Sequence, residues 1–448
     1  MSTKGEKPLA EDIDEETARQ DYIDNVLIDI YKTDEEKLET FGQCPDCNDY
    51  GQDWCKSCND VRFRQAFSAW TSGNKEIDYF IQNSQIYAMT SVTVLEWWPY
   101  KTFSNIEKIG KGGYGTVFRA NTGIQRIKGW DKQNNRWLRY EKSDSPELPL
   151  YREFVALKTL GYPQHLPKNF LDEAKRLQRW AYKSPDWFSP ILQGFTKNER
   201  TGQYYFVIEF CSRGDIRKTL CEEHTWSDKL IIIDQIARDM CTIHEAGLIH
   251  RDLHPGNVLR ATDSLDYINI HDLGLCIPQS EANDIEEVMG VMPYVAPELF
   301  DGGKYSTATD VYAFGMLMWE IGTGKKPFHN IPHNVSLAFQ IHNGLRPQIT
   351  KDMPQFYCDL MRKCWDSNLK NRPTAEEIYD LTTEWCCEPT EEIEDQIANA
   401  EELRQSSINT ESENLEETQH SQAIYTSRLM PDLTRKFADF DFEIPYGI

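Results

Sequence analysis

The sequence predicts an α+β fold with appendages at both ends, and three observations lead to this prediction. Strand-like residues, β-branched or aromatic, concentrate in the first half, above all in residues 204–210 (YYFVIEF). Apolar helical patterns dominate the second half, where Ile232, Ile236, Met240 and Ile243 share one face and residues 309–321 are apolar almost all round. The length of 448 residues is too great for one ordinary domain.

The formal charge of −24 is concentrated at the two ends of the chain. Residues 1–40 contribute −8 and residues 388–448 contribute −11. Both segments are predicted to be mostly disordered acidic tails that are available to protein partners. A pI near 4.9 argues against a nucleic-acid partner, because such binding depends on neutralising phosphates.

No run of 18 apolar residues occurs, and the N-terminus lacks the basic and apolar regions of a signal peptide. We therefore expect a cytoplasmic protein without a membrane partner. The twelve cysteines are then expected to be thiols or metal ligands and not disulfides.

Within residues 1–40, Ile23, Leu27 and Tyr31 are spaced to line one face of a short helix. Residues 41–95 are predicted to form a small module. Two CxxC pairs begin it, and four thiolates in two tight pairs can close a tetrahedron around a structural zinc ion. The ligands would be Cys44, Cys47, Cys55 and Cys58. The alternative is four unmetallated thiols or a redox pair.

Two short amphipathic helices are predicted next, from aromatic and aliphatic residues at helical spacing within 63–70 and 77–81. Their apolar faces are expected to pack against the cysteine module or the following domain. Farther on, residues 130–137 have the pattern of a hairpin with a tryptophan at each end.

A glycine-rich turn follows the module. Gly110, Gly112 and Gly115 stand where the backbone must turn sharply and approach phosphates, and strand-like residues follow from Val117. A dinucleotide-binding turn has similar glycines, but there a helix would follow.

The stretch from His250 to Leu259 (HRDLHPGNVL) carries the chemistry. Asp252 is followed five residues later by Asn257, and Asp272-Leu-Gly comes fifteen residues after that. Hard oxygen ligands at this spacing suit magnesium, and phosphoryl transfer requires positioning and charge neutralisation. We predict that Asp252 orients a substrate hydroxyl while Asn257 and Asp272 hold Mg²⁺.

These residues resemble the eukaryotic protein-kinase superfamily, and His254 with Asp272-Leu-Gly resembles its tyrosine-kinase-like group. The resemblance covers residues 101–387. It implies a bilobal kinase fold, with an N-lobe of residues 101–211 and a C-lobe of residues 212–387, that transfers the γ-phosphoryl group of ATP to a protein hydroxyl, preferentially serine or threonine. The block from CPDC through WTSGN to LEWWPY resembles more specifically a kinase family expanded in arbuscular mycorrhizal fungi.

The resemblance also implies a nucleotide site. Lys158 would contact the ATP phosphates and pair with Glu173, with Asp172 as the rival acid. Ile208 would be the gatekeeper. The adenine and ribose contacts would be Val117, Ala156, Glu209, Cys211, Asp215 and Leu259. His254 occupies the position of a phosphate-contacting lysine.

An activation segment is expected between Asp272 and Glu298, with Ser280 and Tyr294 as its only hydroxyls. Its acids, Glu281, Asp284, Glu286 and Glu287, either pair with Arg251 in place of a phosphate or form a solvated face. By family analogy Arg372 pairs with Glu298, and Asp310 anchors the catalytic loop.

Three further possibilities remain open from the sequence. The chain could be a pseudokinase scaffold, although none of its motif residues is lost, or a tyrosine or dual-specificity kinase. The zinc module could be the main binding unit. In the C-terminal tail, residues 437–446 (FADFDFEIPY) are either untethered or a docking peptide.

Overall fold

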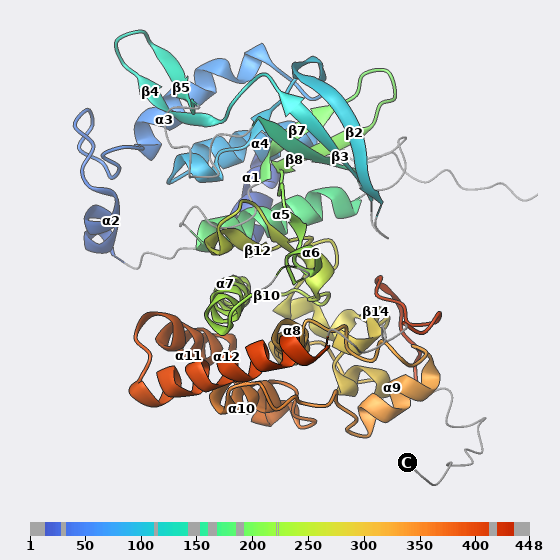
Figure 1. Ribbon diagram of the computed structural model, residues 1–448. Helices are drawn as coiled ribbons and strands as arrows, with labels where there is room; N and C mark the ends of the chain where they lie inside the picture. Colours follow the sequence, from blue (N-terminus) through green and yellow to red (C-terminus); the bar gives the residue numbers. More distant parts are fainter. Residues whose placement is uncertain are drawn as a thin grey trace, which may run out of the picture. The chain divides into compact units, whose positions relative to one another are not determined.

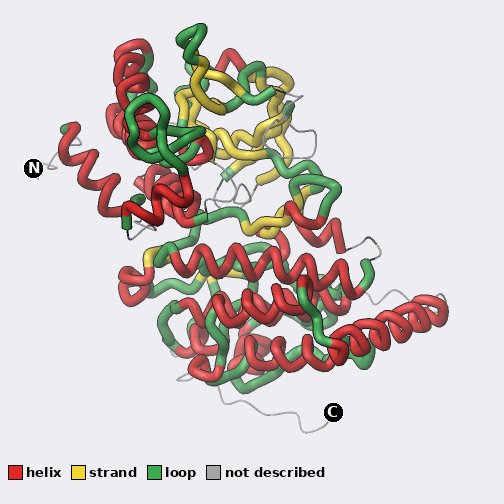
Figure 2. The backbone as a smooth tube through the Cα atoms, turned by 90° about the vertical axis from the view of Figure 1, so that its left-hand side faces the viewer, coloured by secondary structure: helices red, strands yellow, loops and turns green. Residues whose placement is uncertain are grey.

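The structure is a computed structural model that describes residues 14–27, 33–111, 115–141, 153–159, 168–184, 192–220, 222, 224–411 and 419–433 (Figure 1). The chain divides into an N-terminal unit, which ends at Phe210, and a C-terminal unit, which begins at Cys211. Most of the strand residues lie in the first unit and helices predominate in the second (Figure 2). The α+β prediction is therefore confirmed.

The described strands of the N-terminal unit form a six-stranded sheet in the order β1-β7-β8-β6-β3-β2. Each pair is antiparallel except β1 with β7. Alternating residues of the central strands, such as Val155 and Leu157 on β6, build its core with Trp98, Phe103 and Val207. The strands are β1 (Glu96–Trp97), β2 (Phe103–Lys111), β3 (Thr116–Thr122), β6 (Phe154–Lys158), β7 (Leu192–Lys197) and β8 (Tyr204–Glu209).

Two helices precede the sheet near the two predicted positions, but the first begins and ends earlier than expected, so Phe67 and Trp70 lie beyond its C-terminal end. Helix α3 (Lys56–Ala66) begins at the second cysteine pair, and α4 (Lys75–Tyr87) is capped by Asn74, whose side chain accepts a hydrogen bond from Ile77 N. Strands β4 (Ile127–Asp131) and β5 (Arg136–Arg139) form the predicted hairpin. Phe63 of α3 stacks on Trp137 of the hairpin with ring centroids 4.3 Å apart, so the module is packed against this insertion.

Helix α1 (Glu15–Asn25) corrects the expectation for residues 1–40. Its buried face consists of Ala18 and Tyr22, with Val26 just beyond its end, and not of Ile23 and Leu27; Tyr31 lies outside the described residues. Tyr22 stacks on Tyr87 of α4, and Asp21 pairs with Lys175 of α5 (Lys168–Lys183) at 2.9 Å. A second helix, α2 (Asp34–Phe41), starts at a capping box on Thr33.

The C-terminal unit is mainly helical. Its central helix α8 (Thr307–Thr323) is buried from Thr309 to Gly322, as its apolar sequence predicts. Helix α7 (Trp226–Glu245) carries the predicted face of Ile232, Ile236, Met240 and Ile243, all buried. The remaining described helices of this unit are α6 (Ile216–Leu220), α9 (Val335–His342), α10 (Gln355–Cys364), α11 (Ala375–Cys387) and α12 (Glu391–Glu411).

Short strands of the C-terminal unit hold its functional loops. They are β9 (Gly214–Asp215), β10 (Leu248–Ile249), β11 (Val258–Arg260), β12 (Ile268–Ile270), β13 (Ile277–Pro278), β14 (Met289–Gly290) and β15 (Arg428–Leu429). In the part of the chain described, these form the groups β12-β11-β9, β10-β13 and β14-β15. The last pair joins the predicted activation segment to the C-terminal tail.

The tail from residue 388 differs from the expectation of disorder in two described stretches. Helix α12 packs against α7, where Glu401 Oε2 accepts a hydrogen bond from Trp226 N at 3.1 Å and Ala400 is buried. The hydrogen bond from Arg404 lowers the pKa of Glu401 to about 2. Residues 419–433 run along the C-terminal unit and bury Ala423, Met430 and Leu433. Residues 437–446 lie outside the described residues.

Candidate functional site

In the N-terminal unit, a lysine and a glutamate form a buried ion pair. Lys158 ends β6, and its Nζ lies 2.7 Å from Glu173 Oε1 on α5. Both side chains are buried, whereas Asp172, the rival acid, lies 3.8 Å from Lys175 on the helix surface. The structure therefore selects Glu173 as the partner of Lys158, and the pair fixes α5 against the sheet.

The other predicted nucleotide contacts of this unit lie on neighbouring strands. Val117 is the register partner of both Gly110 and Lys158, and Ala156 is the register partner of Ile208. Glu209 ends β8 opposite Val155. Gly112 lies outside the described residues.

In the C-terminal unit, Asp310 fixes the backbone of the loop that contains Asp252, as predicted. Its Oδ2 accepts a hydrogen bond from His250 N at 2.7 Å and its Oδ1 accepts one from Arg251 N at 2.9 Å. Burial opposes the charge of Asp310, but the hydrogen bond from His244 and the positive potential of His244 and His250 outweigh burial and lower its pKa. Arg251 adopts a φ of 69°, a conformation that costs energy and that these fixed hydrogen bonds maintain.

Asp252 lies among donors. Asn257 Nδ2 donates to Asp252 O at 2.9 Å and to its Oδ2 at 3.2 Å, and His254 Nε2 lies 3.6 Å from Oδ2. His254 Nδ1 accepts a hydrogen bond from Gly256 N, so Nε2 is the nitrogen that carries a proton toward Asp252. Burial raises the pKa of Asp252, but the electrostatic effect of the nearby His254 and hydrogen bonds from His254 and Ser427 outweigh it, and the net direction is downward.

The two predicted magnesium ligands are brought together by the chain that precedes Asp272. His271 N donates to Asn257 O at 2.7 Å, which places Asp272 next to Asn257. Because Asn257 Nδ2 is turned toward Asp252, its amide oxygen is the atom turned away. An amide oxygen and a carboxylate are ligands that Mg²⁺ prefers, so the residues present fit this ion. Asp272 has a φ of 63°, and Gly274 N donates to its Oδ1 at 3.3 Å.

The three remaining predicted contacts lie at the start of the C-terminal unit and on β11. Asp215 of β9 is the register partner of Leu259 of β11, so the structure brings these two residues together. Cys211 is buried with its Sγ 3.3 Å from His271 Nε2. This thiol fills space inside the unit, as the sequence suggested.

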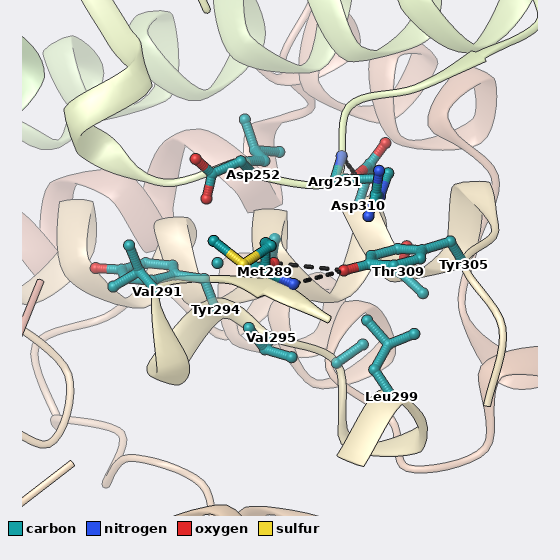
Figure 3. Close-up of a pocket in the computed structure, with 14 residues that line it drawn as sticks. Arg251, Asp252, Met289, Val291, Tyr294, Val295, Leu299, Tyr305, Thr309 and Asp310 are labelled. Atoms are coloured by element: carbon teal, nitrogen blue, oxygen red, sulfur yellow. Dashed lines mark hydrogen bonds between the residues drawn. The ribbon is translucent and has the colours of Figure 1, made fainter. Parts of the chain in front are cut away.

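The described acids of the activation segment do not pair with Arg251, which was one of the two predicted arrangements. Among the described residues, no ion pair joins Arg251 to the carboxylates of Glu281, Asp284, Glu286 or Glu287, although Arg251 Nη2 lies 3.5 Å from the backbone oxygen of Glu287. The Arg251 guanidinium donates instead to Leu275 O at 3.0 Å and lies 4.2 Å from the centre of the Tyr305 ring. Figure 3 shows Tyr305 beside Arg251. The Tyr305 hydroxyl accepts a hydrogen bond from Met289 N and donates one to Met289 O, on β14.

Tyr294 is not an accessible hydroxyl in this segment. It is buried, donates a short hydrogen bond to Glu320 and lies near Arg217. The predicted pair at the end of the segment is confirmed, because Arg372 contacts both carboxylate oxygens of Glu298 at 2.8 Å.

The four cysteines of the N-terminal module form one cluster. Their sulfur atoms all lie within 4.8 Å of one another, with Cys47 and Cys55 3.4 Å apart and Cys44 and Cys58 3.9 Å apart. Sulfur atoms around tetrahedral zinc, with Zn–S bonds of about 2.3 Å, are about 3.8 Å apart. Backbone amides of Asp46 and Cys58 also donate to the sulfur atoms of Cys44 and Cys55. The residues present therefore fit a zinc ion.

One site residue escaped the sequence analysis. Ser427, in the tail predicted to be disordered, places its Oγ 2.5 Å from both carboxylate oxygens of Asp252. In the sequence around Ser427, only the apolar pair Ile424-Tyr425 indicated that this part of the polar tail packs against the protein.

Comparison with known proteins agrees with this arrangement. The model of the protein tyrosine and serine/threonine kinase family matches residues 103–381, which is more than half of the chain. A serine/threonine-protein kinase/receptor of Acanthamoeba polyphaga mimivirus is 26% identical over 68% of the chain, and receptor-interacting serine/threonine-protein kinase 4 of Mus musculus is 28% identical over 65%. A LIM domain-containing serine/threonine-protein kinase of Dictyostelium discoideum is 35% identical over 41%. The alignments span 17%, 35% and 28% of these three relatives, respectively.

Proposed function

The chain belongs to the protein tyrosine and serine/threonine kinase family, and from this premise we propose that it transfers the γ-phosphoryl group of ATP to a hydroxyl of a protein substrate. The observation that carries the proposal is the set of donors around Asp252. With Asn257 and His254 beside it and a lowered pKa, its carboxylate stays ionised and can accept a hydroxyl proton.

Each predicted residue has a role in this proposal. Asp252 orients the acceptor hydroxyl and takes its proton. Lys158, held by Glu173, contacts the phosphates. Asn257 and Asp272 would hold magnesium, which when bound neutralises charge on the phosphates. The backbone at Gly110, Gly112 and Gly115 is assigned to approach the phosphates. Adenine and ribose contacts are assigned to the remaining residues: Val117, Ala156, Glu209, Cys211, Asp215 and Leu259.

A pseudokinase scaffold is the weaker alternative. It would require loss of Lys158, Asp252, Asn257 or Asp272, and all four are present. The buried 2.7 Å pair of Lys158 with Glu173 also favours an active arrangement.

Several finer points belong to the proposal. Serine or threonine is favoured over tyrosine because the relatives named above are serine/threonine-protein kinases. The eleven described cysteines form no disulfide, which is typical of a reducing compartment and supports a cytoplasmic location. Among the described residues, no helix combines the length and the apolar character needed to cross a bilayer. The cysteine cluster is proposed as a structural zinc site, and the fungal family and the partners of the acidic tail stay predictions from the sequence.

The test compares the full chain with its Asp272→Asn variant. Purified protein, labelled ATP, Mg²⁺ and a mixture of casein and a basic protein should yield phosphoserine or phosphothreonine. Asp272→Asn removes a charge from the magnesium site without changing side-chain volume, so transfer should fall by about 100-fold or more while circular dichroism stays unchanged. A variant that transfers at the wild-type rate would refute the site assignment.

A further inference from the structure

The C-terminal tail follows a defined path along the C-terminal unit. Residues 419–433, red in Figure 1, lie beside α9 and β14. Four backbone hydrogen bonds tie the tail to residues between 288 and 333, and three apolar tail side chains are buried. These bonds are His420 N to His329 O at 2.8 Å, His333 N to Gln422 O at 3.0 Å, Met430 N to Val288 O at 2.7 Å and Leu433 N to Phe300 O at 2.9 Å.

Tyr425 anchors the middle of this path. Its hydroxyl donates to Pro327 O at 2.8 Å, and its ring meets His333 edge-on with centroids 4.9 Å apart. Two cations, Arg217 and Lys326, lie 5.4 Å and 5.3 Å from the ring centre. Because its hydroxyl is hydrogen-bonded and its ring contacts two cations, Tyr425 is a specific anchor of the tail and not an incidental surface contact.

Strand pairing then sets the register of the residues that follow. Arg428 pairs with Gly290 and Leu429 pairs with Met289 in the antiparallel ladder β14-β15. A Cβ atom at position 290 would lie 3.0 Å from Val295 Cγ2 and 3.8 Å from Asp252 Oδ1, so the strand residue that pairs with Arg428 lies directly beside Asp252. This is β-strand addition, in which backbone bonds give affinity and register fixes which side chain reaches the site.

The side chain that reaches the site is Ser427. Its Oγ lies 2.5 Å from both Oδ1 and Oδ2 of Asp252. A general base must lie within hydrogen-bond reach of the hydroxyl that it deprotonates, at about 2.6–3.2 Å. The Ser427 hydroxyl is therefore close enough to Asp252 for proton transfer. The neighbouring Thr426 is exposed, whereas Ser427 is half-buried and is the tail residue that hydrogen-bonds to Asp252.

We propose that Ser427 is the phosphoacceptor of an intramolecular transfer, so that the tail is a substrate of its own kinase domain. This inference rests on the proposed function. In the step, Ser427 Oγ forms a bond to the γ-phosphorus of ATP and the bond from that phosphorus to the bridging oxygen breaks. The hydroxyl proton passes to the Asp252 carboxylate, ADP leaves with the bond's electron pair, and no other reactant is needed.

The same geometry explains why transfer would end the contact. Phosphoserine carries a charge of about −1.5 to −2. Next to the Asp252 carboxylate this charge is repelled, so the modified tail should leave the site.

The experiment uses the full chain, first treated with phosphatase and then mixed with ATP and Mg²⁺ over a 100-fold range of about 0.05 to 5 μM protein. Mass spectrometry follows the tryptic peptide that ends at Arg428. We expect phosphate on Ser427, with a first-order rate constant that does not depend on protein concentration. Ser427→Ala should lose this phosphate, Ser427→Thr should retain one, and the matched control Thr426→Ala should behave as wild type.

A parallel reaction with casein and a basic protein separates the two proposals. If these proteins are phosphorylated and Ser427 is not, the inference is wrong and the proposed function stands. If neither these proteins nor the tail are phosphorylated, the proposed function is wrong. A rate on Ser427 that rises in proportion to protein concentration would show transfer between molecules and would overturn the intramolecular step.

Discussion

Replacement of Arg372 by methionine tests the energetics of the C-terminal unit. The Arg372 side chain is 0% exposed and donates two hydrogen bonds of 2.8 Å to Glu298, which is 15% exposed. It also donates to Ala308 O at 2.8 Å and to Asp366 O at 2.9 Å. Methionine retains much of the volume but leaves a carboxylate and two carbonyl groups without their donor.

The size of the effect follows from burial. Removing one partner of a buried ion pair typically costs about 3–5 kcal/mol, because the remaining charge is neither solvated nor compensated. Arg372→Lys keeps the charge but not the bidentate contact with Glu298. We therefore expect it to lower the free energy of unfolding by less than Arg372→Met does. The matched control is Arg362→Met, whose pair with Asp359 is 49% and 55% exposed and should contribute less than about 1 kcal/mol.

Native-state hydrogen exchange of peptides from α8 reports the local free energy of opening. For a loss of about 3–5 kcal/mol, amides that exchange through opening of the C-terminal unit should exchange about 150- to 5,000-fold faster in Arg372→Met. Arg362→Met should exchange like wild type. Equal exchange rates in the two methionine variants would refute the reasoning that burial of this pair makes it essential.

Two further predictions concern metal and regulation. The cysteine cluster predicts one zinc ion per chain, and Cys44→Ser combined with Cys58→Ser should release it. Release should increase protease cleavage in α3, because Cys55 caps this helix and Cys58 lies in its first turn. Metal analysis without zinc and an unchanged digestion pattern would contradict this prediction. Since Tyr294 is buried, Ser280 is the one exposed hydroxyl of the activation segment, and we predict that Ser280→Ala retains wild-type activity toward casein; loss of activity that a phosphate at Ser280 restores would contradict this.

Local sequence patterns were sufficient to predict many of the secondary-structure elements and the residues of the candidate site. Helical periodicity identified α7 and α8, and the two tryptophans of residues 130–137 identified the hairpin. The spacing of Asp252, Asn257 and Asp272 led to residues that the structure holds close to one another through His271. These predictions succeed because each depends on neighbours in the chain or on a short loop whose chemistry is specific.

Local sequence patterns predict the structure poorly where contacts between distant segments outweigh local composition. The buried face of α1 is set by α4 and α5, so the apolar Ile23 and Leu27 were a poorer guide than the packed Tyr22. The acids of the activation segment were one option for Arg251, but Tyr305 and backbone carbonyl groups occupy its guanidinium.

The tail shows the same limit most clearly. Its composition alone predicts disorder, since few residues can be buried. Its order comes from strand pairing with β14, the anchor Tyr425 and buried Ala423, Met430 and Leu433. The sequence by itself was sufficient to predict that Asp252 belongs to a phosphoryl-transfer loop; only the tertiary structure decided that Ser427, 175 residues away, faces it. Such a contact depends on backbone groups and on register, which the identity of the side chains in one segment does not encode.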